Sequence, residues 1–194
     1  MLSDAGWVRG RDWFDEYRRT AMYCFTIHPS PVGLIALASD GGHLVGLWLE
    51  GQKYHGNTIP AAMTEKDDLP VFDAAKQWLD RYFAGGKPAI SALPLEPIGS
   101  AFRQGVWGIL CEIPYGSVMT YSEIAKKMGC RSSQAVGGAV GHNPISIIIP
   151  CHRVVGANGS LTGYAGGIGA KAKLLALEGV DMSKLFAPKK GTAL

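Results

Sequence analysis

The sequence predicts an α+β protein in two parts, a small α/β domain followed by a mainly helical domain. Short apolar runs around a Gly-rich turn indicate β structure in residues 22–50. From residue 70 onward, apolar residues recur at helical spacing, and a stretch rich in Pro and Gly separates the two patterns. We therefore place an N-terminal extension at 1–21, the α/β domain at 22–86, a connector at 87–99, the helical domain at 100–180 and a C-terminal tail at 181–194.

A β-hairpin and one helix are predicted in the first domain. The hairpin consists of the apolar run 32–38, a turn at Asp40-Gly41-Gly42 and the run 43–49. Residues 51–68 are polar, and we expect them to be irregular. An amphipathic helix follows at 70–83 and ends at Gly85-Gly86. Its apolar face consists of Val71, Ala74, Ala75, Trp78, Leu79 and Tyr82.

The second domain is predicted to begin with a helix at 100–112, in which Phe102, Val106, Trp107, Ile109 and Leu110 are buried. Two short helices follow at 121–128 and 132–140, and Thr120 and Glu123 have the spacing of a capping box. A pair of short helices joined by a Gly-containing turn is consistent with a helix-turn-helix, although many proteins that bind no DNA contain one. The later elements are an apolar β-type run at 145–149, a hairpin turn at Asn158-Gly159, a flexible loop at 163–169 and a helix at 170–178.

Two adjacent glycines, Gly137 and Gly138, lie inside the second of the short helices. Each costs about 1 kcal/mol relative to Ala in a helix interior. Either a ligand approaches the backbone closely there, or the helix packs tightly against another. Spacing alone favours neither interpretation.

Composition and charge limit the class of protein. Hydrophobic residues make up 47% and charged residues 18%, which is typical of a globular chain with a core. No apolar run approaches the roughly 18 residues of a membrane span, and the first twenty residues lack the apolar segment of a signal peptide. We therefore expect a cytoplasmic monomer. Residues 100–194 carry 10 Lys and Arg against 4 Asp and Glu, so this half either meets a polyanion or shows the uneven charge common in small proteins.

Cys151 is the strongest candidate for chemistry. The four cysteines, at 24, 111, 130 and 151, form no C-x-x-C pair, so neither a zinc ribbon nor a dithiol redox motif is indicated. A cysteine reacts as thiolate, which requires a group that lowers its pKa or takes its proton. His152 is adjacent, a water could carry the proton between them, and Glu178 could orient the imidazole. On these residues alone, a structural cysteine remains an alternative.

The residues around Cys151 resemble those of a known family. Pro-Cys-His-Arg-Val at 150–154 follows Gly-His-Asn-Pro at 141–144 and precedes Thr-Gly-Tyr at 162–164 and Leu-Leu-Ala-Leu-Glu-Gly at 174–179. This pattern closely resembles the O6-alkylguanine-DNA alkyltransferases, or methylated-DNA–protein-cysteine methyltransferases, in their free-standing bacterial form. The resemblance covers residues 22–180. It implies an α/β N-terminal domain and a helical DNA-binding domain with a helix-turn-helix.

The resemblance also implies a function. The alkyl group of O6-alkylguanine in DNA, with O4-alkylthymine as a second candidate substrate, is transferred irreversibly to Cys151, once per protein molecule. The partner is double-stranded DNA that carries the lesion, and neither a cofactor nor a metal is expected. Because the target atom is buried in the duplex, the nucleotide must be flipped into a pocket, which costs a few kcal/mol. Gly137 and Gly138 would then allow the DNA to come close.

Each matching residue is given a role by the resemblance. His152 and Glu178 match a water-mediated proton relay, and Asn143 matches the hinge between the recognition helix and the active-site strand. Tyr121 matches the tyrosine that helps to rotate the nucleotide and donates to the guanine. The positions around the alkyl pocket and the flipped base are matched by Tyr164, Val154 and Ala165.

Two positions need separate treatment. Many family members carry an intercalating arginine where this chain has Gln134, and we expect Arg131 and Arg153 to supply part of the missing positive charge toward DNA. Some members bind zinc in the N-terminal domain. Cys24 and His28 would share one face of a strand, but two further ligands are not evident, so we expect no zinc site.

Three other functions compete with repair. A DNA-binding regulator would use alkylation of Cys151 as a signal, but no additional activating domain is evident. A lesion-binding relative without catalysis would lack the cysteine. A cysteine hydrolase would leave the basic helix-turn-helix unexplained and would need a local signature that the sequence lacks.

We predict that residues 1–21 are dispensable. The β region and the resemblance both begin at Met22, which can itself serve as an initiator. A shortened chain that starts at Met22 should fold and transfer alkyl groups at the full-length rate in a single-turnover assay. Misfolding or lost transfer would instead make the extension part of the first domain.

Overall fold

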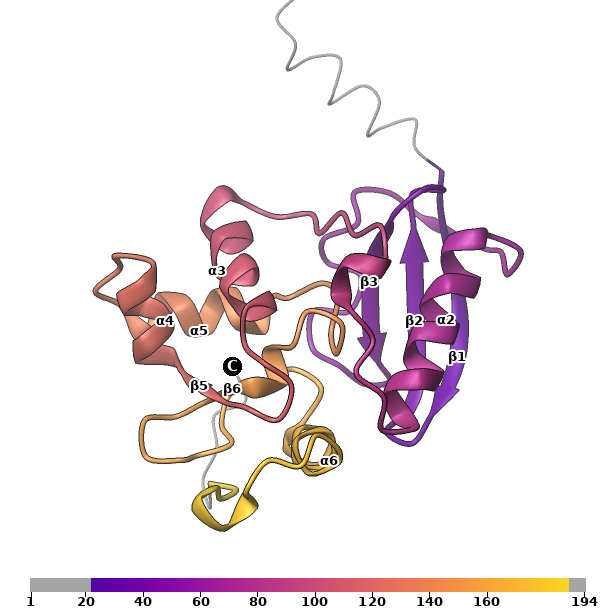
Figure 1. Ribbon diagram of the computed structural model, residues 1–194. Helices are drawn as coiled ribbons and strands as arrows, with labels where there is room; N and C mark the ends of the chain where they lie inside the picture. The colour runs from indigo at the N-terminus through magenta and orange to yellow at the C-terminus, as the bar shows by residue number, and fades with distance from the viewer. Residues whose placement is uncertain (1–21, 189–194) are drawn as a thin grey trace, which may run out of the picture.

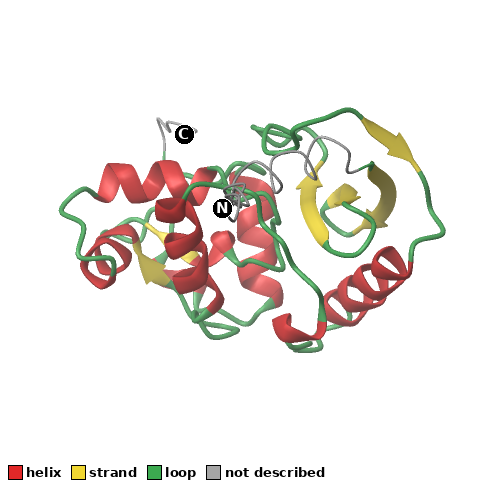
Figure 2. Cartoon of the chain, turned by 90° about the horizontal axis from the view of Figure 1, so that it is seen from above, coloured by secondary structure: helices red, strands yellow, loops and turns green. Residues whose placement is uncertain are grey.

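The computed structural model describes residues 22–188, so the prediction about residues 1–21 lies outside the described residues. A sheet with one covering helix forms one side of the molecule, and a group of helices forms the other (Figure 1). The view from above shows the connector running between the two sides (Figure 2). No helix in residues 22–188 has both the length and the apolar character needed to cross a membrane.

The N-terminal sheet has four strands in the order β3-β2-β1-β4. Strands β1 (Tyr23–Ser30), β2 (Gly33–Ser39) and β3 (Leu44–Leu49) are antiparallel, and β4 (Met63–Glu65) runs parallel to β1. The predicted hairpin turn is confirmed, because Asp40 Oδ1 accepts bonds from the amides of Gly42 and His43 and Gly41 has φ 104°. The expectation of an irregular stretch at 51–68 is wrong at β4, where pairing with β1 overrides the polar sequence.

Helix α2 (Pro70–Phe83) covers the sheet and has the predicted bounds. Its buried residues include Trp78, Leu79 and Tyr82, as the helical spacing predicts, whereas Ala74 is only half-buried. Pro70 at the first helical position needs no amide partner, and Gly85 (φ 84°) lets the chain turn away after the helix. A 3-10 turn, η1 (Ile90–Ala92), lies within the connector.

The helical domain contains α3 (Ala101–Cys111), α4 (Tyr121–Lys127), α5 (Ser133–Gly141) and α6 (Ile168–Leu177). The capping box at Thr120 and Glu123 is present, and Gly129 (φ 63°) joins the two short helices α4 and α5. On α3, Val106, Trp107 and Leu110 are buried as predicted. Phe102 is exposed and Ile109 half-buried, because the helix presents only one narrow face to the core.

The apolar run 145–149 is a turn and not the predicted strand. Only Ile145 makes a bridge, with Leu47 of β3, and Ile147 takes the left-handed conformation (φ 69°). That conformation costs on the order of 1–3 kcal/mol in a non-glycine residue. The buried side chain of Asn143 supplies hydrogen bonds to the backbone of Ile145 and Ile149 that a sheet partner would otherwise make.

The two halves share one core. Buried residues from β2, β3 and α2 form a single cluster with those of α3, α5 and the turn at 145–149. Strand β3 also bonds the helical domain directly, because the Leu47 amide donates to Pro144 O (2.8 Å) and Leu47 O accepts from the Ser146 amide (2.9 Å). The segment that leads into Cys151 is therefore fixed by the N-terminal sheet.

Two short strands, β5 (Met119–Thr120) and β6 (Val154–Val155), pair in parallel, and β6 follows the 3-10 turn η2 (Cys151–Arg153). The hairpin expected at Asn158-Gly159 is only a turn, because the chain after it pairs with the C-terminal segment. There the Leu161 amide donates to Phe186 O (2.9 Å), beyond the 3-10 turn η3 (Met182–Lys184). The described part of the C-terminal tail thus packs against residues 156–161.

We predict that Gly159→Ala destabilises the protein more than Gly41→Ala. Both glycines have positive φ, 88° and 104°, so each alanine should cost roughly 1–2 kcal/mol in backbone strain. Only at Gly159 would the added Cβ meet backbone, 2.2 Å from Lys184 O, and overpacking should add roughly 1–3 kcal/mol. Urea unfolding of the two variants measures the difference. Equal losses would mean that the C-terminal segment moves away without cost.

Candidate functional site

Cys151 begins the η2 turn at the centre of the helical domain and is only 4% exposed. Its Sγ accepts a hydrogen bond from Asn143 Nδ2 at 3.0 Å. Burial raises the pKa of the thiol above its ordinary value, although the Asn143 bond and the charge of Lys171 oppose that shift. The resting group is therefore a thiol, and it needs a base before it can act as a nucleophile.

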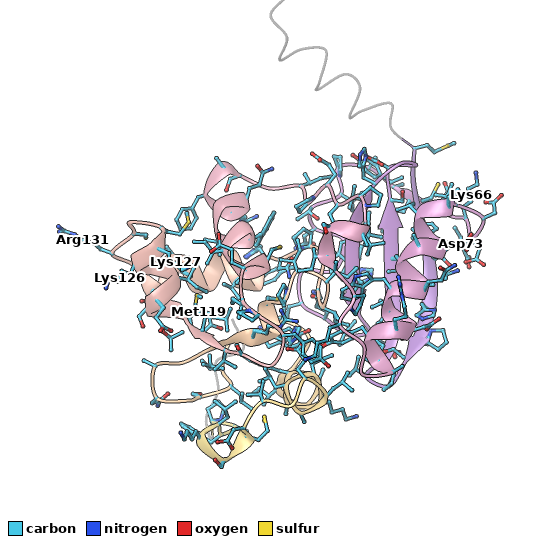
Figure 3. The ribbon with its side chains drawn as sticks, in the orientation of Figure 1. Lys66, Asp73, Met119, Lys126, Lys127 and Arg131 are labelled. Atoms are coloured by element: carbon cyan, nitrogen blue, oxygen red, sulfur yellow. The ribbon has the colours of Figure 1, made fainter. Side chains whose placement is uncertain are left out.

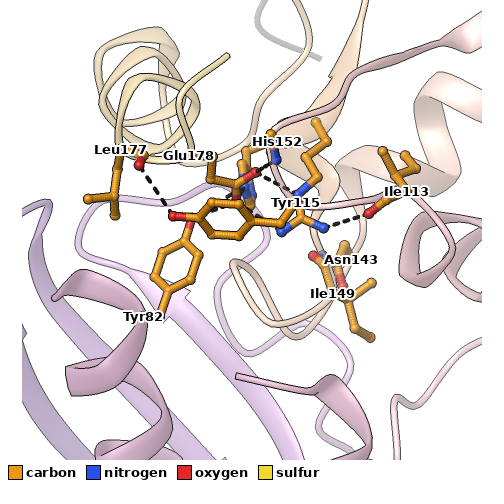
Figure 4. Close-up of polar contacts among 10 residues, drawn as sticks. Tyr82, Ile113, Tyr115, Asn143, Ile149, His152, Leu177 and Glu178 are labelled. Carbon is orange, nitrogen blue, oxygen red and sulfur yellow. Dashed lines mark hydrogen bonds and ion pairs between the residues drawn. The ribbon is translucent and has the colours of Figure 1, made fainter. Parts of the chain in front are cut away.

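His152 is completely buried, and its Nε2 lies 2.7 Å from Glu178 Oε1 (Figure 4). An ionised carboxylate can only accept, so Nε2 carries the proton and Nδ1 carries the free lone pair. Nδ1 is buried and makes no hydrogen bond within residues 22–188. Burial lowers the pKa of His152 although Glu178 opposes the shift, so the ring is a neutral base at Nδ1.

Glu178 caps the end of α6 and is surrounded by donors. Oε1 accepts from Tyr82 Oη (2.8 Å), His152 Nε2 (2.7 Å) and Arg153 Nη2 (3.0 Å), while Oε2 accepts from Arg153 Nε (2.8 Å) and the Gly116 amide (3.2 Å). Burial would raise the pKa of Glu178, but the bonds and charges of His152 and Arg153 lower it to about 2. The carboxylate is thus a permanent anion beside the imidazole.

Arg153 does not face outward, and the expectation that it supplies charge toward DNA is wrong. Its guanidinium is buried, forms a bidentate pair with Glu178, and donates from Nη1 to Ile113 O at 2.6 Å. Because all these donors are used inside the protein, the side chain is structural. The planar guanidinium group of arginine is well suited to bind a carboxylate through two parallel hydrogen bonds, as Arg153 binds Glu178.

Two further residues of the site were not singled out from the sequence. Tyr82 was predicted only as core, yet its hydroxyl reaches Glu178 from the other domain. Lys171 is completely buried and donates to the carbonyls of Val154 (2.5 Å) and Thr162 (3.0 Å). Burial lowers the pKa of Lys171 to about 8, although Cys151 opposes the shift. Helical spacing could have indicated that Lys171 is buried, because it places Lys171 on the same face of α6 as Leu174, Leu175 and Glu178.

The loop 162–166 lies beside this cluster. Tyr121, at the start of α4, donates from its hydroxyl to Thr162 O (3.1 Å) and lies 3.4 Å from Gly163 O. Tyr164 is buried, with its ring edge-on to His152 at 6.5 Å between centroids. Val154 is buried in the two-stranded sheet, and Ala165 is half-buried. Tyr164, Val154 and Ala165, which the resemblance places around the pocket, thus lie in the segments that border Cys151, and Tyr121, which it matches to nucleotide rotation, contacts one of these segments.

Helices α4 and α5 carry the remaining candidates on a separate surface. Arg131 lies in the turn between them, with Lys126 and Lys127 close by at the end of α4 (Figure 3). Gln134 is exposed in the first turn of α5. The two glycines differ, because Gly137 is buried whereas a Cβ on Gly138 would meet nothing within 4 Å. Burial of Gly137 agrees with the interpretation by helix packing, and the open space over Gly138 leaves room for a ligand to approach.

The described residues contain no group of three or more His, Cys, Asp and Glu side chains that could hold a metal ion. Cys24 and His28 both lie on β1, and His28 Nε2 bonds Asp80 Oδ1 at 2.9 Å. This bond joins β1 to α2, which carries Asp80.

The arrangement supports one kind of chemistry. A buried thiol lies next to a neutral imidazole, and a carboxylate fixes the tautomer and can stabilise the imidazolium that forms. Such a site can deprotonate the Cys151 thiol, and the thiolate can attack an electrophile that is small enough to reach Sγ.

Comparisons with known proteins agree with this site. Residues 22–97 match the model of the 6-O-methylguanine DNA methyltransferase, ribonuclease-like domain, and residues 101–180 match that of the DNA binding domain of the same enzyme. The methylated-DNA–protein-cysteine methyltransferase of Haemophilus influenzae is 45% identical over 160 residues, 82% of this chain and 87% of that protein.

Solved structures are similar as well. The crystal structure of Mycobacterium tuberculosis O6-methylguanine methyltransferase has a TM-score of 0.72 at 42% identity, over 81% of this chain and 93% of that one. The structure of Mycobacterium tuberculosis OGT in complex with DNA has a TM-score of 0.70 at 40% identity, over 84% and 94%.

Proposed function

The chain belongs to the methylated-DNA–protein-cysteine methyltransferase family, and we propose that Cys151 is the cysteine on which it receives the alkyl group. The activity is DNA repair by transfer of the alkyl group of O6-methylguanine to the protein. The observation that carries the assignment is the arrangement around the thiol: Asn143 donates a hydrogen bond to the buried Cys151 Sγ, and the next residue, His152, is held by Glu178 as a neutral base with an Nδ1 that is free among residues 22–188. We place the reaction in the cytoplasm, on duplex DNA, with the protein as a monomer.

The proposed reaction uses one proton relay and one displacement. The Cys151 thiol gives its proton, through a water, to Nδ1 of His152, and Glu178 stabilises the imidazolium. The thiolate attacks the alkyl carbon, the carbon–O6 bond breaks with its electrons on the guanine, and Tyr121 donates a proton or hydrogen bond to the leaving base. The product is a thioether, which water does not displace, so each molecule reacts once.

Helices α4 and α5 would bind the DNA and bring the lesion to Cys151. The target atom is inside the duplex, so the nucleotide is rotated out and bound near Cys151 between Tyr164, Val154 and Ala165. Gly138 leaves room for the DNA backbone, and Arg131 with the neighbouring lysines attracts the phosphates. Gln134, which is exposed in the first turn of α5, would fill the gap left by the flipped nucleotide.

A regulator that uses alkylation of Cys151 as a signal is the alternative. It would share the site and differ in having a transcriptional output. Transcript levels in cells carrying the wild-type chain and the Cys151→Ala variant, before and after alkylation, distinguish the two.

We predict one-shot stoichiometry at Cys151. Incubation with duplex DNA containing O6-methylguanine should add a single methyl group per molecule, and intact mass with peptide mapping should locate it on Cys151. Cys151→Ala should bind the DNA and transfer nothing. Multiple turnovers, or transfer by the alanine variant, would falsify the assignment.

We predict that Glu178→Gln slows transfer at least tenfold at saturating DNA, out of the roughly 10²- to 10⁴-fold that general acid–base catalysis contributes. A neutral amide stabilises imidazolium poorly, while DNA affinity should stay nearly unchanged. Single-turnover rates and DNA titrations measure the two effects. Glu65→Gln is the matched control, because Glu65 is an exposed glutamate on β4, away from the Cys151 site and from α4 and α5. An unchanged rate would remove Glu178 from the relay.

The same substitution has a stability consequence. It leaves the buried Arg153 without its carboxylate and should cost roughly 3–5 kcal/mol, so rates are compared where both proteins are folded. In the wild type, the lowered pKa of Glu178 gives stability that is complete above about pH 4.5 and is lost as the pH falls toward 2. The variant should lack this part of the acid dependence in urea unfolding.

We predict that Gln134 intercalates, with a weaker effect than an arginine. Its amide can hydrogen-bond the orphaned base, but it lacks a planar cation that stacks and attracts phosphate. Gln134→Ala should slow transfer from duplex DNA, and Gln134→Arg should preserve or raise the rate. On free alkylguanine base, where nothing is flipped, both variants should react nearly as the wild type does. If Gln134→Ala leaves duplex repair unchanged, another residue fills the gap.

A further inference from the structure

The catalytic carboxylate receives a hydrogen bond from the other domain. Tyr82, in the last turn of α2, donates to Glu178 Oε1 at 2.8 Å, and its hydroxyl lies 3.5 Å from His152 Nε2 (Figure 4). Tyr82 is 1% exposed and is 96 residues distant from Glu178 in the sequence. Its hydroxyl thus brings α2 to the Cys151 site.

The two oxygens of Glu178 are not held in the same way. Arg153 binds both in a bidentate fork, so it does not distinguish the oxygen that faces the imidazole from the other. The Tyr82 hydroxyl contacts only Oε1, the oxygen that also accepts from His152 Nε2. The tyrosine therefore adds a constraint to Oε1 alone, and this constraint keeps that oxygen within hydrogen-bond reach of the imidazole.

Tyr82 is itself held rigidly. Its ring stacks on Trp78 at 5.5 Å between centroids and 12° between planes, and it meets the ring of Tyr115 edge-on at 6.1 Å. Helix α2 is in turn packed on the N-terminal sheet. Burial, and next the charge of Glu178, raise the pKa of Tyr82 far above its ordinary value, so the hydroxyl remains a neutral donor.

We propose that Tyr82 is a positioning residue, through which the N-terminal domain holds Glu178 Oε1 on His152 and so sets the rate of proton transfer from Cys151. The proposal rests on the proposed function of Cys151. A purely structural Tyr82 would fill the core and satisfy its own hydroxyl, and its loss would loosen the protein without acting specifically on the relay.

The test is Tyr82→Phe in the full chain. The ring and its stacking on Trp78 remain, and four donors still bind Glu178, so the variant should fold. The single-turnover rate on saturating duplex DNA containing O6-methylguanine should fall about tenfold, a fraction of the total general acid–base contribution. DNA affinity should change less than twofold. Tyr115→Phe is the matched control, because its hydroxyl bonds Leu177 O beside the same carboxylate but does not contact Glu178.

A second variant distinguishes an effect of Tyr82 on the proton relay from a general loss of structural stability. His152→Gln keeps the Glu178–Arg153 pair but has no base for the relay. If Tyr82 acts through the relay, adding Tyr82→Phe to His152→Gln should slow the residual transfer less than twofold, so the two effects are not additive. A structural defect would slow both backgrounds by the same factor, and that result overturns the proposal.

An NMR measurement tests the proposal independently of the transfer rate. The Nε2–H proton of His152 should shift or broaden in the NMR spectrum of Tyr82→Phe and remain unchanged in Tyr115→Phe. An unchanged resonance together with an unchanged rate would also overturn the proposal, while leaving Cys151 as the acceptor. Failure of the wild type to become alkylated on Cys151 would instead overturn the proposed function.

Discussion

The buried carboxylate of Glu178 is the interaction on which the rest of the site depends. An isolated charge in the protein interior is costly, so the donors around it stabilise the fold as well as serving the chemistry. Those donors come from α2, the loop at residue 116 and the η2 turn, while Glu178 itself ends α6. One ion therefore ties together four segments that are far apart in the sequence.

This constraint explains why the two halves form one core. Strand β3 bonds the turn before Cys151, and α2 supplies Tyr82 to the carboxylate behind it. The left-handed Ile147 between these contacts is a strained conformation, kept in place by Asn143 on one side and by β3 on the other. The cysteine is thus fixed in position before any substrate arrives, and the N-terminal domain contributes to that preorganisation although it carries no residue that reacts.

Sequence reasoning succeeded where local signals are strong. The bounds of α2, the capping box of α4 and the turn at Gly41 follow from periodicity, caps and glycine conformation, and the motif around Cys151 predicted the contact between His152 and Glu178. It failed where tertiary contacts decide. The isoleucines at 145–149 have high β propensity, but the Asn143 side chain replaces a sheet partner. The positive charge of Arg153 is typical of a residue that contacts DNA, but Arg153 is buried and its guanidinium binds Glu178. Helical spacing predicts that Tyr82 is buried, but no local pattern pairs its hydroxyl with Glu178, 96 residues away.

The site also suits a protein that reacts once. A permanent thiolate on the surface would be oxidised or alkylated by other electrophiles, and the molecule would be lost without repairing DNA. Burial raises the pKa of Cys151, so the resting thiol is poorly reactive. The neutral His152 is held ready by a carboxylate that is already ionised, so only one proton has to move when a lesion reaches the sulfur. In the proposed mechanism, desolvation suppresses the thiolate of the resting protein, and the proton passes to His152 when the sulfur attacks the alkyl carbon of a bound lesion.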